Sequence, residues 1–239
     1  MSSATLPSTR APHLRKAYLA IILLLIAMVA WGFWPTYYGP LLRGVAPHPW
    51  WIHLHAAVFA GWMALLLFQS WLASTGRIRL HRRLGQLGIF YAAAVLILGL
   101  TVTFAATSAH VRSGRLTLDA AAENLLFPLV DMALFAGFFT AAIAWRRKPE
   151  IHKRLILAAT VSLAYAALSR ILSVETLLFL PLWLSPLFAA MAFDLATRRR
   201  IHPALLTSAA ILTLAWARIY IMQSPAWLKT ARTLLAPFL

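Results

Sequence analysis

Long apolar runs, separated by short segments rich in arginine and lysine, follow one another along almost the whole chain. Most of these runs have roughly the 20 residues that a helix needs to cross about 30 Å of hydrocarbon. The pattern predicts an all-α, polytopic membrane helical bundle with seven transmembrane helices, at residues 17–34, 50–73, 85–107, 124–145, 155–179, 182–196 and 203–222. The run at 182–196 is the shortest, and only a proline-containing junction separates it from the run before it.

The two ends of the chain differ from the apolar runs. We expect residues 1–16 to form a basic tail, residues 17–223 the transmembrane bundle, and residues 224–239 an amphipathic helix on the outer membrane surface. The first apolar run is too long for a cleavable signal peptide, and it ends in aromatic rather than small residues.

Lysine and arginine are unevenly divided between the two sides of the predicted bundle. The N-terminal tail and three alternate links carry 15 of them, the other side carries 5, and Arg170 and Arg218 lie inside predicted spans. Cytoplasmic loops of membrane proteins carry the excess of positive charge. The sequence therefore predicts a multi-pass protein of a bacterial inner membrane, with a cytoplasmic N-terminus and the C-terminus outside.

Composition supports a membrane location and excludes several other classes. The chain is 62% hydrophobic and only 12% charged, which is unlike a soluble or disordered protein. Its net charge of +16 lies in the gaps between apolar runs, so we interpret it as a topology signal and expect no nucleic acid partner. With no cysteine, the chain has neither a thiolate metal site nor a covalent haem attachment motif.

Three of the basic links resemble one another, and each contains one histidine before a rising helix. They are GRIRLHRRLG (76–85), RRKPEIHKRLI (146–156) and RRRIHPALL (198–206), with His81, His152 and His202 in matching places. Such a repeat suggests three helical hairpins arranged around a common axis, with the first helix added.

These histidines have two interpretations. Each could cap a helix or contact lipid phosphate, and Pro203 directly after His202 favours a cap because proline suits the first helical turn. Alternatively, two of them hold the iron of a haem b, since neutral imidazole is its usual protein ligand. In that case the neighbouring arginines could bind the haem propionates. His81 and His152 are the preferred pair.

Charged residues also occur within the predicted spans. Counted from the basic side at about 1.5 Å per residue, Asp131, Arg170 and Arg218 all lie roughly 21–22 Å up, and His55 lies about 28 Å up. Charged groups at this depth normally face the bundle interior and are paired. We therefore expect these four residues to form one polar cluster in the outer half of the membrane.

The cluster could be a structural lock or a binding site. One carboxylate pairs with only one of two guanidiniums, so the second either reaches towards the surface or binds an anionic or carbonyl group, such as a quinone head group. Near the opposite boundary, Asp194 is expected to pair with Arg198 one turn later.

Several of these residues carry a resemblance to known families. His55 with Gln69, the run 81–85 (HRRLG) and the run 152–155 (HKRL) resemble a family of bacterial multi-span membrane proteins, over roughly residues 50–220. That resemblance implies a membrane bundle but no particular activity. A fainter similarity to cytochrome b561-like proteins implies haem held between helix histidines. His55 is the clear intramembrane histidine on the outer side, so a second haem is not expected.

Three functions follow from these features. The leading one is an integral membrane protein without assigned chemistry, in which the Asp131, Arg170, Arg218 and His55 cluster binds a small, anionic or lipidic ligand or supports a larger membrane complex. The second is a haem b electron-transfer protein linked to quinone, which is also the form an enzyme would take. The third is a small transporter or proton pathway that uses Asp131 and His55.

Overall fold

The computed structural model describes residues 12–45 and 48–239, and these are mostly helical. Six helices belong to apolar spans: α1 (Pro12–Phe33), α3 (Trp50–Ser74), α4 (Ile78–Arg112), α5 (Leu118–Ala144), α6 (Pro149–Leu168) and α9 (Pro203–Trp216). The others are α2 (Gly39–Leu42), α7 (Phe179–Trp183), α8 (Ser185–Arg198) and α10 (Pro225–Leu235). Residues 1–11, which form most of the predicted basic tail, lie outside the described residues.

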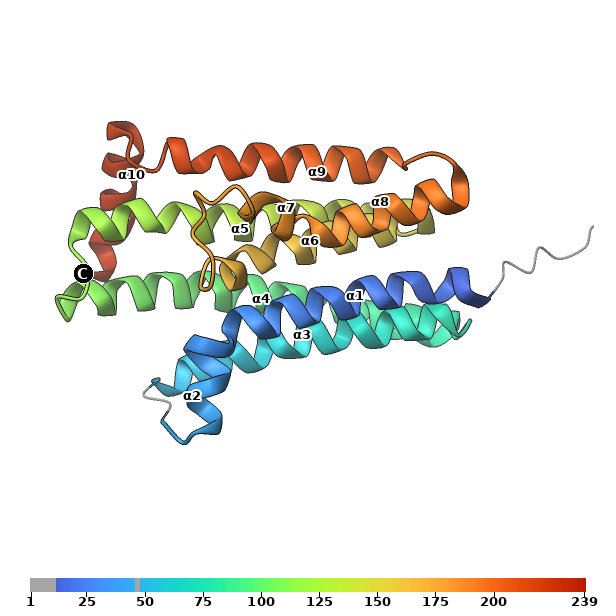
Figure 1. Ribbon diagram of the computed structural model, residues 1–239. Helices are drawn as coiled ribbons and strands as arrows, with labels where there is room; N and C mark the ends of the chain where they lie inside the picture. The colour runs from blue at the N-terminus through green and yellow to red at the C-terminus, as the bar shows by residue number, and fades with distance from the viewer. Residues whose placement is uncertain (1–11, 46–47) are drawn as a thin grey trace, which may run out of the picture.

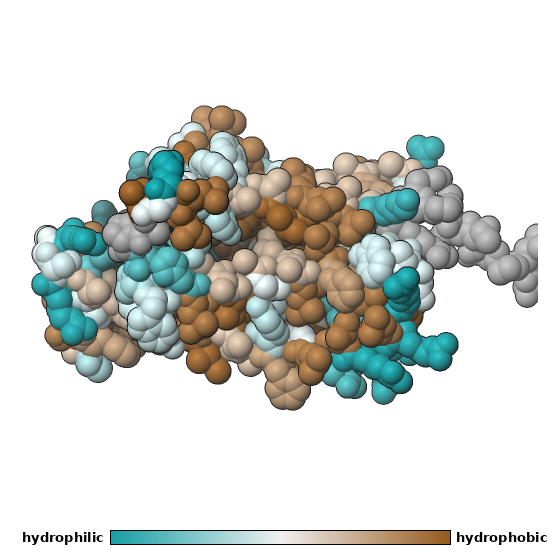
Figure 2. Space-filling model, turned by 90° about the horizontal axis from the view of Figure 1, so that it is seen from below, coloured by the Kyte–Doolittle hydropathy of each residue, from teal (hydrophilic) through white to brown (hydrophobic). Residues whose placement is uncertain are grey.

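The long helices run side by side along one axis (Figure 1). The α3–α4, α5–α6 and α8–α9 links meet at one end, which we call the basic end because it carries the three arginine-rich repeats. The links after α1, α4 and α6 and the C-terminal helix lie towards the other end. On the face shown in Figure 2, hydrophobic residues cover the middle of the molecule and hydrophilic residues lie towards both ends. This distribution is that of a protein embedded in a bilayer.

Six helices within the described residues are long and apolar enough to cross a membrane. They confirm the polytopic helical bundle, with the first span extended to Leu42 and the last to Tyr220 through short turns of non-α helix. The predicted helix at 182–196 is instead the broken pair α7 and α8. Since α8 has 14 residues, it is only about 21 Å long, and the seventh span stays a prediction.

The predicted helix at 155–179 has the wrong boundaries. α6 begins at Pro149, because proline suits a first helical turn, and ends at Leu168. Residues 169–178, which follow, are polar at several positions and form turns. The basic link is therefore shorter than predicted, and a non-helical segment replaces the last part of the span.

The hydrophobic core is centred on α6, which is the most buried of the six spans. Its small residues Ala158, Ala159 and Ala164 are fully buried and let neighbouring helices approach closely. α1 approaches so closely that a Cβ atom added to Gly32 would lie 2.4 Å from the carbonyl oxygen of Ala167. Small residues on both helices thus fix the distance between α1 and α6.

The C-terminal segment forms α10, which crosses the end of the bundle (Figure 1). Ala231 and Leu235 are fully buried, and the indole nitrogen of Trp227 donates a hydrogen bond to the carbonyl of Ala122 in α5 at 2.9 Å. Residues 225–235 therefore form a helix that packs on α5, and its place on the outer membrane surface stays a prediction.

Candidate functional site

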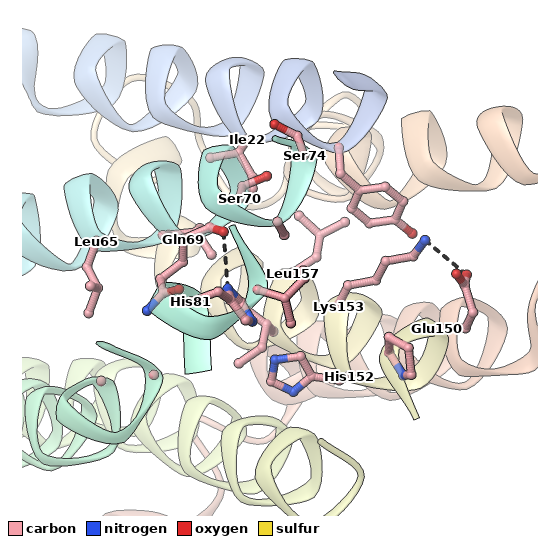
Figure 3. Close-up of a pocket in the computed structure, with 18 of the residues that line it drawn as sticks. Ile22, Leu65, Gln69, Ser70, Ser74, His81, Glu150, His152, Lys153 and Leu157 are labelled. Atoms are coloured by element: carbon pink, nitrogen blue, oxygen red, sulfur yellow. Dashed lines mark hydrogen bonds and ion pairs between the residues drawn. The ribbon is translucent and has the colours of Figure 1, made fainter. Parts of the chain in front are cut away.

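A cavity of about 480 Å³ opens between the helices near the basic end. Its volume is in the range of small-molecule and cofactor sites. Its walls combine apolar side chains with a few polar groups (Figure 3). Ile22, Leu65 and Phe139 are among the apolar residues, and Gln69, His81 and His152 are among the polar ones. These residues come from α1, α3, α4, α5 and α6, so the cavity is a property of the assembled bundle.

Two histidines lie side by side in this cavity. The ring centres of His81 and His152 are 6.5 Å apart, and the ring planes are nearly perpendicular, at 83°. Each histidine is the fourth residue of its helix, α4 or α6, so the two repeats place them at matching positions.

In each of these imidazoles, the Nδ1 atom lies within hydrogen-bond distance of a backbone carbonyl oxygen. The Nδ1 atom of His152 lies 2.8 Å from the carbonyl oxygen of Ala142, and Nδ1 of His81 lies 3.2 Å from that of Gln69. An Nδ1–H group that donates to a carbonyl fixes the tautomer and leaves a lone pair on Nε2 for a metal. At a ring-centre spacing of 6.5 Å, the two imidazoles would be close enough to hold one metal-containing group together.

The side chain of Gln69 adds a second contact to His81. With its amide nitrogen turned towards the ring, it donates to Nδ1 of His81 at 2.7 Å, while its oxygen accepts from the backbone N–H of Gly85 at 3.0 Å. That orientation makes Nδ1 an acceptor and moves the proton to Nε2. The Gln69 amide and the Gln69 carbonyl therefore favour different tautomers of His81. Sequence reasoning gave this glutamine no part in a site.

Two glycines keep the α4 wall of the cavity flat. Gly85 and Gly88 follow His81 by one and two turns and both line the cavity. A Cβ added to Gly85 would meet nothing within 4 Å, and one added to Gly88 would meet only Leu65, at 3.7 Å. A flat ligand could lie directly against this wall.

A group of charged side chains surrounds the cavity at its polar end. Glu150, Lys153 and Arg198 all line it, and Oε2 of Glu150 lies 2.9 Å from Nζ of Lys153 (Figure 3). The same carboxylate forms ion pairs with Arg198 and, at 2.7 Å, with Arg154. From the sequence, these cations are a topology signal, the arginines near His152 are possible partners of haem propionates, and Arg198 is the expected partner of Asp194, whereas Glu150 has no predicted role.

Behind this group lies a fully buried ion pair between α6 and α8. Two guanidinium nitrogens of Arg154 donate to the two carboxylate oxygens of Asp194. Asp194 also accepts from the backbone N–H of His202 at 3.1 Å, and its distance to Nε of Arg198 is 3.8 Å. The predicted Asp194–Arg198 pair is therefore present, but Arg154 is the closer partner.

The third repeat histidine has a different role in the fold. His202 precedes α9 as its N-cap, and its Nδ1 atom accepts a hydrogen bond from the backbone N–H of Ala204 at 3.1 Å. Burial, with a smaller effect of the positive charge of Arg154, lowers the pKa of His202 and keeps Nδ1 available as an acceptor. His202 thus has the capping geometry, whereas His81 and His152 come together in the cavity.

In the other half of the bundle, Asp131 pairs with Arg218. Their closest carboxylate and guanidinium atoms are 2.7 Å apart, and each residue is only 3% exposed. The guanidinium also lies over the ring of Tyr165, at 4.1 Å. Within the described part of the chain, Nε and Nη1 of Arg218 and the Tyr165 hydroxyl make no hydrogen bond.

Arg170 does not join this pair, contrary to the expectation. It lies beyond the end of α6, where its guanidinium donates to the Ala166 carbonyl and sits 4.5 Å from the ring centre of Phe33. No salt bridge joins Arg170 to Asp131 among residues 12–45 and 48–239. The depth argument failed here because it assumed one continuous helix through residue 179. His55 stacks on Phe59 with ring centres 4.3 Å apart, and its buried Nδ1 atom makes no hydrogen bond to any described residue.

Comparison with family models, with curated proteins and with solved structures finds no match. Within residues 12–45 and 48–239, no group of three or more His, Asp or Glu side chains could hold a metal ion. The geometry of the cavity is therefore the basis for any assignment of function.

Proposed function

We propose that this multi-span membrane protein binds one haem b in the cavity near its basic end and serves as a membrane electron carrier. The observation that carries the proposal is the His81–His152 pair, with ring centres 6.5 Å apart and each Nδ1 atom against a backbone carbonyl. Membership of the resembled bacterial family stays a prediction.

Haem suits the donor set better than a bare metal ion does. Two imidazoles supply two ligands, whereas structural metal sites in proteins usually need four. A porphyrin supplies the other nitrogens itself, so His81 and His152 would be enough to hold its iron. Its flat, apolar ring also suits the wall formed by Gly85 and Gly88, where an added Cβ would have open space or a single contact.

The residues of the chain would hold, orient and shield this group. His81 and His152 would hold the iron, the Ala142 carbonyl would orient the ring of His152, and Gln69 would position the ring of His81. Apolar side chains such as Leu65 and Phe139 would exclude water from the ring. Bound haem supplies one-electron transfer, and axial ligands with their hydrogen bonds tune its potential. A quinone in the bilayer is the electron partner that we propose.

The absorption spectrum of the purified protein tests this function. A Soret band is expected in protein from haem-replete cells, and it should be lost in His81→Ala and in His152→Ala. His110→Ala is the matched control, since His110 is exposed and lies outside the cavity, and it should retain the band. A colourless wild-type protein, or full haem content in both cavity variants, would contradict the proposal.

The Asp131–Arg218 pair supports a second candidate, the binding of a small polar ligand. The favouring observation is that Nε and Nη1 of Arg218 and the hydroxyl of Tyr165 are buried and make no hydrogen bond to a described residue. Such groups normally bind water, an ion or a ligand. If the pair is only a lock, Asp131→Asn should unfold the protein and a paired Asp131→Asn/Arg218→Gln change should restore stability. If it serves binding or transport, Asp131→Asn should abolish that activity in folded protein.

A further inference from the structure

The polar end of the cavity has two layers of charge that differ in exposure. The Arg154 and Asp194 side chains are fully buried and bind each other with two hydrogen bonds. The side chains of Lys153 and Arg198 are 31% and 27% exposed, and both pair with Glu150, which is itself 31% exposed. The buried pair joins two helices, whereas the outer group lines the cavity and is accessible.

The charges in these two layers do not balance. Among the described residues, three cations, Lys153, Arg154 and Arg198, contact two carboxylates, those of Glu150 and Asp194. Asp194 pairs mainly with Arg154. Lys153 and Arg198 therefore share the carboxylate of Glu150, which Arg154 also contacts. The mouth of the cavity therefore carries a surplus positive charge.

Partly exposed ion pairs of this kind are weaker than fully buried ones and exchange partners more readily, because water screens part of their attraction. An anionic group of a ligand in the cavity could therefore replace Glu150 at two cations that are already in place. Charge-assisted hydrogen bonds from lysine and arginine are the usual way in which proteins bind carboxylates.

We infer that Lys153 and Arg198 form an anion subsite, which binds the carboxylates of a flat amphipathic ligand in exchange for Glu150. The inference rests on the proposed function, in which the haem propionates are these carboxylates. In this arrangement the apolar ring lies among the helices, and its charged edge faces the basic end. The subsite thus orients the ligand, while the histidines hold its centre.

The test compares two porphyrins that differ only in charge at this edge. Purified full-length protein is titrated with hemin and with hemin dimethyl ester, whose carboxylates are blocked. Lys153→Gln and Arg198→Gln should each weaken hemin binding about tenfold, the usual effect of losing one charged hydrogen bond, and leave diester binding unchanged. Glu150→Gln should strengthen hemin binding, because it removes the competing carboxylate.

Two further variants make the result specific. Lys148→Gln removes a nearby cation that lies over Trp145 and does not line the cavity, so hemin binding should not change. Lys153→Arg keeps the charge and should preserve the preference for hemin over its diester. Equal losses for both porphyrins in Lys153→Gln and Arg198→Gln, or no loss for either, would overturn the subsite.

Failure of the proposed haem function gives a different result. In that case neither porphyrin binds the wild-type protein, and the same variants are tested with a fluorescent fatty acid and its methyl ester. The subsite predicts a preference for the free acid that disappears in Lys153→Gln and Arg198→Gln. Absence of that preference in the wild type would overturn the subsite as well.

Discussion

The two buried ion pairs of the bundle differ in how well their hydrogen bonds are satisfied. Asp194 binds Arg154 through both carboxylate oxygens and also accepts a backbone N–H group. Asp131 contacts Nη2 of Arg218 at 2.7 Å, but Nε and Nη1 of the same guanidinium make no hydrogen bond within the described residues. A buried charge whose hydrogen bonds are only partly satisfied is costly. We therefore interpret the Arg154–Asp194 pair as structural and the Asp131–Arg218 pair as a candidate binding site.

Removing one member of the well-satisfied pair should destabilise the protein strongly. Asp194→Ala leaves the Arg154 guanidinium buried without its main partner, and breaking such a pair costs about 3–5 kcal/mol. Thermal unfolding in detergent measures the effect. Asp119→Ala is the control, because the Asp119–Arg232 pair is largely exposed and such pairs are worth about 1 kcal/mol or less. Equal effects of the two changes would contradict this assignment.

The cap formed by His202 should make stability depend on pH. Because burial lowers the pKa of His202, the folded protein takes up this proton less readily than the unfolded chain. Stability is therefore expected to fall as the pH drops below about 6.5, where an unfolded histidine becomes protonated. His202→Asn keeps a capping side chain but does not titrate. Its melting temperature should fall less than that of the wild type between about pH 7.5 and 5.5, and equal falls would rule out this role.

Errors in the predicted helix boundaries limited how well the site residues could be placed from the sequence. The apolar runs predict the bundle well, because hydrocarbon thickness sets the length of a span. The repeat analysis placed His81 and His152 at matching positions, and both are the fourth residue of their helices. The Arg170 prediction failed because α6 starts at Pro149 and ends at Leu168. Apolar content alone does not show where a helix unwinds.

The contacts of the cavity were less predictable than its histidines. The contact of Gln69 with His81 depends on how α3 packs against α4, and that of Glu150 with Arg198 on how α6 packs against α8. Glu150 and Lys153, by contrast, lie one turn apart on α6. One signal was available, since Glu150 is an acidic residue inside an otherwise basic link. A lone carboxylate among cations in a membrane protein is a candidate for an ion-pair network.

Close packing of α1 against α6 gives a test at the level of helices. Gly32→Ala would bring a methyl group to within 2.4 Å of the Ala167 carbonyl oxygen, so α1 must move away. Overpacking of this kind typically costs about 1–3 kcal/mol. Gly137→Ala is the matched control, because its added methyl group would meet nothing within 4 Å. Thermal unfolding should show a loss only for Gly32→Ala, and an unchanged Gly32→Ala variant would contradict this packing.

Charge asymmetry is the main feature of the molecule as a whole. Of 6 acidic residues, only Glu150 and Asp194 lie near the basic end, together with most of the 22 lysines and arginines. Such an excess favours the cytoplasmic side of a membrane. The predicted orientation therefore places the cavity and its cationic mouth towards the cytoplasm.

The absence of cysteine makes this orientation simple to test. Single cysteines at Thr75 and Ser113 would lie in exposed turns at opposite ends of α4. A membrane-impermeant maleimide should label Ser113→Cys in spheroplasts, and Thr75→Cys only after the membrane is permeabilised. The reverse pattern would invert the topology and place the cavity on the outer side.

The spin state of bound iron tests the central claim, a haem held by two histidines, most directly. Electron paramagnetic resonance of the oxidised protein should show a low-spin ferric signal, because two imidazoles give a strong ligand field. Loss of one ligand in His81→Ala or His152→Ala should give high-spin iron or no haem. A wild-type protein without a haem signal, or a low-spin signal retained in both variants, would contradict the account.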